Sequence, residues 1–457
     1  MRYNLNKTVA TAILIVLSVY AASAQDVAAP WFNLFDGKTL NCWEQKGGEA
    51  KYFVEDGTIV GQTVTNTPNS FLCTKDDFGD FILEYDVLLN RATNSGVQFR
   101  SHSNPDYLNG KVFGYQCEID PSDRKWSGGI YDESFRGWLF PVTDDVKAQN
   151  AFKMGQWNHY RIEAIGAAIR TFVNEIPVAN LEDDYTKSGF IALQVHSIGN
   201  KKEDEGIKIQ WKNIRIITDR PEKYVTKTTV ALKQNHNTLT KTEIESGWKL
   251  LWDGKTSNGW TSSRSETFPA SGWEIKNGIL SVIESDGAES ARGGDIVTTG
   301  NYSNYVLMVD FKLSPGANSG IKYFVDRSIN KQMGSAIGLE YQLLDDKIHP
   351  DAKLGRAEGI RTLASLYDLK MAVNKVPNFI GEWNHAMIVS DKNHVEHWLN
   401  GVKVLEYVRG SEEFRKLVSE SKYAGIPGFG ELTEGPILLQ DHGNNVSFRD
   451  IKIRVIK

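Results

Sequence analysis

Apolar residues in this chain fall in short segments, many of which alternate with polar residues at the two-residue period of a β-strand. The segments 81–87 and 305–311 are clear strand predictions because they are rich in β-branched and aromatic residues. Turn sequences such as Glu55-Asp56-Gly57 and Leu399-Asn400-Gly401 separate neighbouring segments. The 3.6-residue period of a helix is scarce, and we expect one short helix at 411–421. The pattern predicts an all-β protein.

A series of motifs occurs twice and in the same order, which indicates an internal repeat. The matching markers are Leu34-Phe35-Asp36-Gly37 with Leu251-Trp252-Asp253-Gly254, Trp43 with Trp260, Asn94-Ser95-Gly96 with Asn318-Ser319-Gly320, Trp157-Asn158-His159 with Trp383-Asn384-His385, Asn174 with Asn400, and Gln194-x-His196 with Gln440-x-His442. Many short strands joined by hairpin turns predict a two-sheet sandwich of the jelly-roll type in each copy. We expect the first β-sandwich at 26–219, a linker rich in Lys, Thr and Asn at 220–246, and the second β-sandwich at 247–457.

The first residues carry the pattern of a secretory signal peptide. Arg2 and Lys7 precede an apolar run at 9–19, and Ala22-Ser23-Ala24 supplies small residues for cleavage before Gln25. The run falls well short of the ~20 residues that a membrane span needs, so we interpret 1–24 as a signal peptide rather than an uncleaved anchor. This interpretation predicts an exported protein, periplasmic in a bacterium, with no membrane span after cleavage.

Charge and cysteine content exclude two classes of function. The 52 basic and 57 acidic side chains give a net charge of −5 without a basic block, which argues against a nucleic-acid partner. Cys42, Cys73 and Cys117 are too few and too scattered for a disulfide framework or a metal knuckle. We expect them to be small buried apolar residues. The oligomeric state is not indicated.

Strand alternation places polar side chains in rows on one face of each copy. The rows are Gln98 with Arg100, Gln116 with Glu118 and Asp120, and Gln194 with His196 in the first copy, and Lys322, Glu340 with Gln342, and Gln440 with His442 in the second. An ordinary solvated sheet face also alternates, but rows of Gln, Glu, Arg and His can form a hydrogen-bonding floor for sugar hydroxyls. Four aromatic residues in the intervening loops could supply apolar walls, namely Trp126, Tyr131, Trp138 and Tyr367.

Both copies resemble the 3-keto-disaccharide hydrolase domain family of the Bacteroidetes type, formerly a domain of unknown function. In the first copy the resemblance rests on Leu34-Phe35-Asp36-Gly37-Lys38-Thr39, Asn94-Ser95-Gly96, Gly114-Tyr115-Gln116-x-Glu118-Ile119-Asp120, Gly129-Ile130-Tyr131-Asp132-Glu133 and Gly155-x-Trp157-Asn158-His159. In the second copy it rests on Ala317-Asn318-Ser319-Gly320, Glu340-Tyr341-Gln342, Leu366-Tyr367-Asp368, Gly381-Glu382-Trp383-Asn384-His385, His397-Trp398-Leu399-Asn400-Gly401 and Leu439-Gln440-Asp441-His442-Gly443. The first copy departs from the last motif, because it has Val195-His196-Ser197. The resemblance implies two tandem concanavalin A-like jelly-roll β-sandwiches.

The resemblance also implies an enzyme that cleaves glycosidic bonds of 3-keto sugars, so an oxidised carbohydrate is the expected substrate. A ketone at C3 acidifies the proton on C2, which a base can remove while donors stabilise the enolate and an acid protonates the departing oxygen. The expected catalytic residues are Glu340 and His442 in the second copy and Glu118 and His196 in the first. The expected substrate-binding residues are Gln342, Gln440, Lys322 and Tyr367 in the second copy and Arg100, Gln116, Gln194 and Tyr131 in the first. We favour the second copy as the active one.

Other interpretations of single motifs remain open. His159 and His385 fit buried strand histidines bonded to backbone, and Asp36, Asp253 and the Asn-Ser-Gly triplets fit turns. The sequence requires no cofactor. A divalent metal held by Glu, Asp and His from the polar face is left open, because no spacing such as His-x-x-x-His is present.

Two rival functions also stay open. The first is a non-catalytic glycan-binding or adhesion module, since the same fold serves both roles. The second is a two-carboxylate glycosidase, which is less favoured because no acidic pair recurs in both copies.

Overall fold

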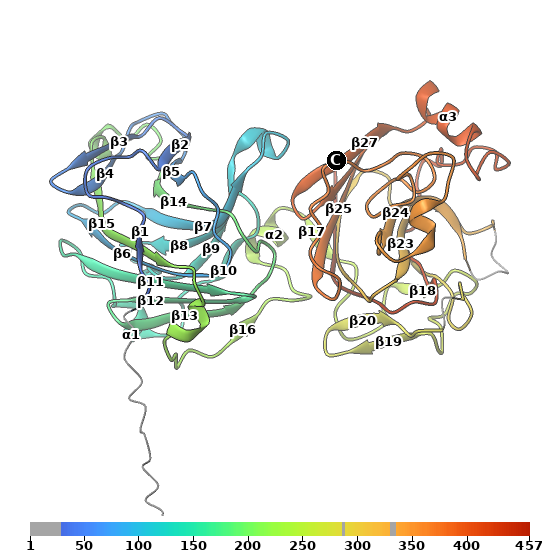
Figure 1. Cartoon of the computed structure of the whole chain (residues 1–457), viewed down its shortest axis with the longest axis horizontal. Coiled ribbons are helices and arrows are strands. Elements are labelled where there is room, and N and C mark those ends of the chain that lie inside the picture. The colour runs from blue at the N-terminus through green and yellow to red at the C-terminus, as the bar shows by residue number, and fades with distance from the viewer. Residues whose placement is uncertain (1–28, 286–287, 330–334) are drawn as a thin grey trace, which may run out of the picture.

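The computed structural model describes residues 29–285, 288–329 and 335–457, and the predicted signal peptide lies outside the described residues. Two β-sandwiches lie beside each other, one formed by the first copy of the repeat and the other by the second (Figure 1). The prediction of an all-β chain with two tandem β-sandwiches is therefore confirmed.

The first domain packs two sheets face to face. One sheet, called the outer sheet below, has the order β16-β13-β12-β11-β6-β15-β4-β3, with β1 paired to β15. The other sheet carries the predicted polar rows and is called the site-side sheet; its order is β10-β9-β8-β7-β14-β5-β2. The strand bounds are β1 Phe32–Asn33, β2 Trp43–Gly47, β3 Lys51–Glu55, β4 Thr58–Gln62, β5 Ser70–Thr74, β6 Phe81–Leu89, β7 Ser95–Ser103, β8 Val112–Ile119, β9 Ile130–Glu133, β10 Gly137–Phe140, β11 Asn158–Ile165, β12 Ala168–Val173, β13 Ile176–Glu182, β14 Phe190–Val195, β15 Lys208–Ile217 and β16 Lys233–Gln234. The short helices are η1 Leu108–Gly110, α1 Val146–Gln149, η2 Lys202–Asp204 and η3 Pro221–Tyr224.

The second domain repeats this plan. Its outer sheet has the order β19-β20-β29-β22-β25-β26-β27, with β17 paired to β29, and its site-side sheet has the order β18-β21-β28-β23-β24. The strand bounds are β17 Trp248–Leu250, β18 Trp260–Ser262, β19 Trp273–Lys276, β20 Ile279–Val282, β21 Ile296–Thr298, β22 Tyr305–Leu313, β23 Asn318–Asp326, β24 Ile337–Leu344, β25 Trp383–Asp391, β26 His394–Leu399, β27 Val402–Val408, β28 Leu438–Leu439 and β29 Val446–Val455. The helices of this half are α2 Lys241–Glu245 in the linker, η5 Pro350–Lys353 and α3 Glu412–Ser419.

Several local predictions agree with the structure. The strands expected at 81–87 and 305–311 are β6 and β22, and the helix expected at 411–421 is α3, whose N-cap is Ser411. Asp36 and Asp253 accept hydrogen bonds from the backbone two and three residues later, as turn-forming residues do.

Other local predictions are wrong. The Asn-Ser-Gly triplets are not turns, because they open strands β7 and β23. Cys73 and Cys117 are buried, but Cys42 is exposed.

Each core lies between the two sheets of its domain and is filled by the apolar members of the alternating strands. Trp211 in the first domain and Trp252 in the second are completely enclosed. Because these members face inward, the polar members of β23 and β24 face outward from the site-side sheet.

The linker is ordered and fastened to both domains. Its strand β16 pairs in parallel with β13 of the first domain, and α2 begins with a capping box made by Thr240 and Glu243. Glu243 then accepts a 2.6 Å bond from Lys452 of β29. His236 Nδ1 lies 2.8 Å from Asp450 on the same strand.

Charged groups also connect the two domains directly. Arg449 of the second domain lies 2.6 Å from Asp184 of the first and 3.3 Å from Asp310. His385 Nδ1 lies 2.6 Å from Asp310, and its ring packs on Tyr185 with a 4.6 Å separation of ring centroids. His385 is therefore bonded to a carboxylate in the domain interface, as His159 is to Asp86 on the first domain, rather than to backbone alone.

Candidate functional site

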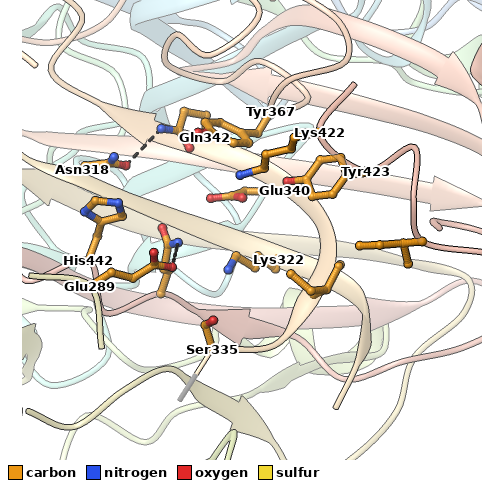
Figure 2. Close-up of a pocket in the computed structure, with 14 residues that line it drawn as sticks. Glu289, Asn318, Lys322, Ser335, Glu340, Gln342, Tyr367, Lys422, Tyr423 and His442 are labelled. Carbon is orange, nitrogen blue, oxygen red and sulfur yellow. Dashed lines mark hydrogen bonds between the residues drawn. The ribbon is translucent and has the colours of Figure 1, made fainter. Parts of the chain in front are cut away.

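A cavity of about 390 Å³ opens on the site-side sheet of the second domain. The six second-copy residues that the sequence predicted all line it, namely Lys322, Glu340, Gln342, Tyr367, Gln440 and His442 (Figure 2). Asn318 was noted only as part of a repeated motif, and the sequence pattern did not single out the other lining residues, which are Glu289, Ser335, Ile337, Gly338, Lys422, Tyr423 and Ile426. A cavity of this size falls in the usual range for small-molecule sites, about 300–1,000 Å³.

Strand register brings the acid and the base groups of the floor together. Lys322 of β23 pairs with Glu340 of β24, and Gly320 pairs with Gln342. A Cβ atom on residue 320 would overlap the Glu340 carboxylate, so this carboxylate occupies the space that the glycine leaves. Burial raises the pKa of Glu340, although Lys322 and Lys422 oppose that effect. Glu340 is thus held where it can carry a proton.

Lys322 is buried with a second carboxylate beneath it. Its Nζ lies 3.5 Å from Oδ2 of Asp295, a residue with no exposed surface that immediately precedes β21. Burial raises the pKa of Asp295 to about 7, with Lys322 opposing the shift. Burial also lowers the pKa of Lys322, but Asp295 and Glu340 outweigh this effect and raise it. The floor therefore carries a protonated lysine between two carboxyl groups.

His442 lies three residues after the end of β28 and has an open ring nitrogen. Within the described residues its buried Nδ1 has no hydrogen-bond partner. The loop that presents it is fixed by Asp441, whose carboxylate accepts 3.0 Å bonds from the backbone of Gly294 and Gly443. The Asp-His-Gly motif thus orients the imidazole, and the free nitrogen can accept or donate a proton.

Two glutamine side chains complete the polar floor. Gln342 Nε2 donates to Asn318 at 3.0 Å, and Gln440 Nε2 donates to Glu289 at 3.3 Å. The carbonyl oxygens of both glutamines are buried and have no partner within the described ranges. Such orphaned acceptors suit the hydroxyl groups of a bound sugar.

The wall of the cavity comes from segments that strand alternation does not cover. Tyr367 donates a 2.7 Å bond from its hydroxyl to Asp351, and Lys422 Nζ lies 4.2 Å from the centroid of its ring. Lys422 and Tyr423 belong to the excursion that follows α3, which has no counterpart among the repeated motifs. The absence of a repeat is the one signal in the sequence that could have drawn attention to this segment.

The first domain replaces the charged floor with amides. Gln98 pairs with Gln116 in β7 and β8, at the register positions that Lys322 and Glu340 hold in the second domain. Leu72 of β5 and Ile296 of β21 hold equivalent positions in the strand pairing of their sheets. Phe71 of the first domain therefore lies at the position that Asp295 holds in the second. The three charged groups of the floor thus have no charged equivalents in the first domain.

The amides of the first domain bond to one another. Gln98 donates to Gln116 at 2.8 Å, and Gln116 donates to Glu118 at 2.9 Å, while Asn94 also donates to Glu118. Burial raises the pKa of Glu118 to about 7. Apart from the carbonyl oxygen of Gln194, which is buried without a partner in the described residues, these amides bond to one another and so offer fewer free groups to a ligand.

The structure does not bring the other residues predicted in the first copy together in one site. His196 bonds through Nδ1 to the backbone of Ser197 at 2.8 Å and lines a separate hollow of about 610 Å³ with Arg124. Tyr131 packs against Trp138 with ring centroids 5.2 Å apart. Gln194 donates to Glu133 at 3.4 Å.

Arg100 does not belong to the predicted polar row. It lies at a β-bulge with φ of 47°, where strand alternation is broken, and its guanidinium is enclosed away from the polar face. It donates to the backbone oxygens of Gly79 and Gly166 and pairs with Asp80 at 2.9 Å. The structure therefore does not bring Arg100 together with the other residues predicted to bind substrate, and its partners are groups of the fold.

Groupings of potential metal ligands in the described part of the chain lie away from the cavity. They are Asp184 with Asp310 and His385 at the domain interface, and His394 with Glu396 and Glu406 on the outer sheet. The first grouping already holds the Arg449 guanidinium. None of the helices in the described residues has the length and apolarity that a membrane span needs.

Comparison with known proteins gives two kinds of match. A family model described as a 3-keto-alpha-glucoside-1,2-lyase-like domain matches residues 30–217 and again residues 247–454. A 3-keto-disaccharide hydrolase of Bacteroides thetaiotaomicron is 36% identical over 230 residues, which cover 46% of this chain and 79% of the relative.

Solved structures give weaker matches. Two candidate glycosyl hydrolases of Parabacteroides distasonis are 31% and 26% identical, with TM-scores of 0.44 and 0.33. These matches cover 49% and 44% of this chain and 100% of each solved chain.

Proposed function

The chain belongs to the 3-keto-alpha-glucoside-1,2-lyase-like family, and we propose that its second domain cleaves 3-keto-glycosides, either glucosides or disaccharides. The observation that carries this proposal is the convergence of Lys322, Glu340 and His442 on one cavity. These residues supply an acid, a base and a cationic donor, which is the set that ketone-assisted elimination requires. The amide floor of the first domain supports the assignment of the chemistry to the second.

The proposed reaction begins at the carbon next to the ketone. His442 removes the C2 proton through its open nitrogen, and Lys322 stabilises the enolate oxygen that forms at C3. The C1–O bond then breaks, and Glu340 gives its proton to the departing oxygen. Addition of water to the C1–C2 double bond gives the 3-keto sugar, so the net reaction is hydrolysis. Gln342 and Gln440 orient the ring through their free carbonyl oxygens.

The first experiment compares a 3-keto-glucoside with its unoxidised parent. We expect cleavage of the keto form alone, with exchange of the C2 hydrogen for deuterium from the solvent. The variants His442→Gln and Glu340→Gln should each lose about 10²–10⁴-fold in kcat while remaining folded by circular dichroism.

The matched controls are His196→Gln and Glu118→Gln in the first domain, which should cleave like the wild type. Normal turnover by both second-domain variants would remove the proposal. Loss of turnover only in the first-domain variants would transfer the chemistry to the other copy.

A non-catalytic glycan-binding role is the second candidate, and the first domain favours it. Its face keeps sugar-binding residue types, with amides and the Trp126–Trp138 pair at a ring separation of 4.7 Å, while lacking the lysine–carboxylate set. This role predicts saturable binding of unoxidised glycan by the Glu340→Gln variant. Binding that vanishes with second-domain substitutions alone would contradict it.

We also propose that the protein acts after export to the periplasm, a proposal supported by the apolar run at 9–19 and the small residues before Gln25. Fractionation of the native host and N-terminal sequencing of the mature protein test this proposal. A mature chain that begins at Gln25 supports it, and a cytoplasmic chain that still begins at Met1 contradicts it.

A further inference from the structure

Lys422 is a basic side chain of the cavity that the proposed reaction does not use. It lies at the mouth, on the excursion that follows α3, and keeps access to solvent. Within the described residues no carboxylate forms an ion pair with its Nζ, whereas Lys322 has Asp295 within 3.5 Å. Its chemical neighbours are the faces of two rings, Tyr367 at 4.2 Å and Tyr423 at 5.1 Å from the centroids.

The surroundings of this amine lower its pKa from the ordinary value of a lysine. Desolvation by the cavity wall lowers the pKa of Lys422, and the positive charges of Lys322 and Arg361 add to that effect against the opposing charge of Glu340. A lysine that is desolvated or placed beside another cation is the usual form of a lysine nucleophile, since only the neutral amine has a lone pair to give.

Hydrogen bonds hold the backbone of Lys422 in place beside the rest of the site. The amide of Lys422 donates a 2.8 Å bond to Asp368, the residue after Tyr367, and Arg361 holds the same carboxylate at 2.7 Å. Figure 2 shows the amine of Lys422 and the carboxylate of Glu340 directed toward each other across the cavity. The amine therefore faces the space that a sugar ring over the polar floor would fill.

We propose that Lys422 is a covalent catalyst that forms a Schiff base with the C3 ketone of the substrate. This inference rests on the proposed function, because it needs a ketone substrate. An iminium at C3 withdraws electrons from C2 more strongly than a ketone does, so it makes the C2 proton easier to remove.

The covalent cycle balances without any further reactant. Nζ attacks C3 to give a carbinolamine, which loses its hydroxyl as water after protonation by Glu340 and leaves a C=N bond. His442 takes the C2 proton to give an enamine, and the glycosidic C1–O bond breaks as the protonated His442 gives that proton to the departing oxygen. Water then adds across the C1–C2 double bond, and a second water hydrolyses the imine, which restores the ketone and the free amine.

Reductive trapping tests this inference. The full chain is incubated with a 3-keto-glucoside and sodium cyanoborohydride, digested, and mapped by mass spectrometry. We expect a hexose adduct on the peptide that carries Lys422, progressive loss of activity as the adduct forms, and no adduct with the unoxidised glucoside. Adducts spread evenly over surface lysines, without enrichment at Lys422, would overturn the inference.

Two substitutions separate a nucleophile from a simple cationic donor. Lys422→Arg keeps a positive charge and hydrogen-bond donors but cannot form the imine, so both Lys422→Arg and Lys422→Ala should lose about 100-fold or more in kcat. Lys416→Arg, at an exposed position on α3, is the matched control and should cleave and trap like the wild type. Near-normal turnover by Lys422→Arg would show that the side chain acts through its charge alone.

The order of the measurements keeps the two proposals distinct. Cleavage by the wild-type chain without reductant is measured first, and its failure would remove the proposed function itself. If the wild type cleaves the keto substrate while Lys422 gives no adduct and Lys422→Arg retains turnover, the function stands and the Schiff base is excluded.

Discussion

Glu340 fits into the cavity floor because residue 320 has no side chain. A methyl group at this position would press on the carboxylate, which is surrounded by strand backbone and by Gln342. The same relation holds in the first domain, where Gly96 lies beneath Gln116. The Asn-Ser-Gly motif is therefore a requirement of the floor, and its resemblance to a turn sequence is misleading.

Gly320→Ala should consequently damage both activity and stability. We expect a loss of about 1–3 kcal/mol in the free energy of unfolding from overpacking, and a fall in kcat because the carboxylate is displaced. Gly96→Ala in the first domain is the control, with a similar loss of stability and unchanged turnover. Denaturant titration and steady-state kinetics measure the two effects. Equal loss of turnover in both variants would contradict the assignment of the floor to one domain.

The raised pKa of Asp295 makes the stability of the folded protein depend on pH. Burial raises its pKa from the ordinary value of 3.8 to about 7, so between these values the folded protein holds a proton that the unfolded chain has released. This group therefore makes the folded state less stable as the pH rises from about 4 to about 7. Asp295→Asn should make that decline shallower, as measured by thermal unfolding at several pH values. An unchanged slope would show that Asp295 is ionised throughout.

At the scale of elements, strand periodicity predicted which side chains of β23 and β24 share a face, because β23 keeps its alternation as far as Tyr323. The prediction failed at Arg100, where a bulge turns the side chain away from the row. It also missed Lys422 and Asp295, because a long excursion and a residue just before a strand have no period to follow. Alternation predicts faces, whereas bulges and loops depend on packing that one sequence does not display.

The helix α3 is a second element with a consequence for the site. Ser411 caps it by accepting a 3.1 Å bond from Phe414, and the Phe414 ring stacks on Tyr407 at 5.8 Å. Ser411→Ala should cost about 1 kcal/mol and loosen the segment that carries Lys422 and Tyr423, so we expect KM to rise. Ser411→Thr, which keeps the cap, is the control. A normal KM in a destabilised Ser411→Ala variant would separate the helix from the cavity wall.

For the whole molecule, the charged groups at the domain interface, which are Arg449, Asp184, Asp310 and His385, predict that the two domains unfold together at low pH. Burial lowers the pKa of His385, but Asp310 outweighs burial and raises it above its ordinary value. The stability that this pair contributes is therefore complete below the ordinary histidine pKa of about 6.5 and is lost as the pH rises through the raised value. Deprotonation of His385 also removes the hydrogen that can bridge its Nε2 to the Asp184 backbone oxygen 3.3 Å away in the first domain. Calorimetry should therefore show one transition at low pH and a weaker coupling of the domains at higher pH.

His385→Gln should remove this pH dependence, and Asp184→Asn should weaken the interface at every pH by taking one partner from Arg449. His159→Gln is the control, because His159 forms the equivalent pair with Asp86 on the first domain, away from the interface. Identical calorimetric profiles for the wild type and His385→Gln would exclude the network as the coupling element.

The attachment of the linker decides where the chain can be cut. A fragment that starts at residue 247 would retain Asp450 and Lys452 but lack their partners His236 and Glu243, and it would expose the surface that the linker covers. A fragment that starts at residue 233 would carry both partners with it. Recombinant expression of the second domain by itself should thus succeed with the longer fragment and give aggregated material with the shorter one.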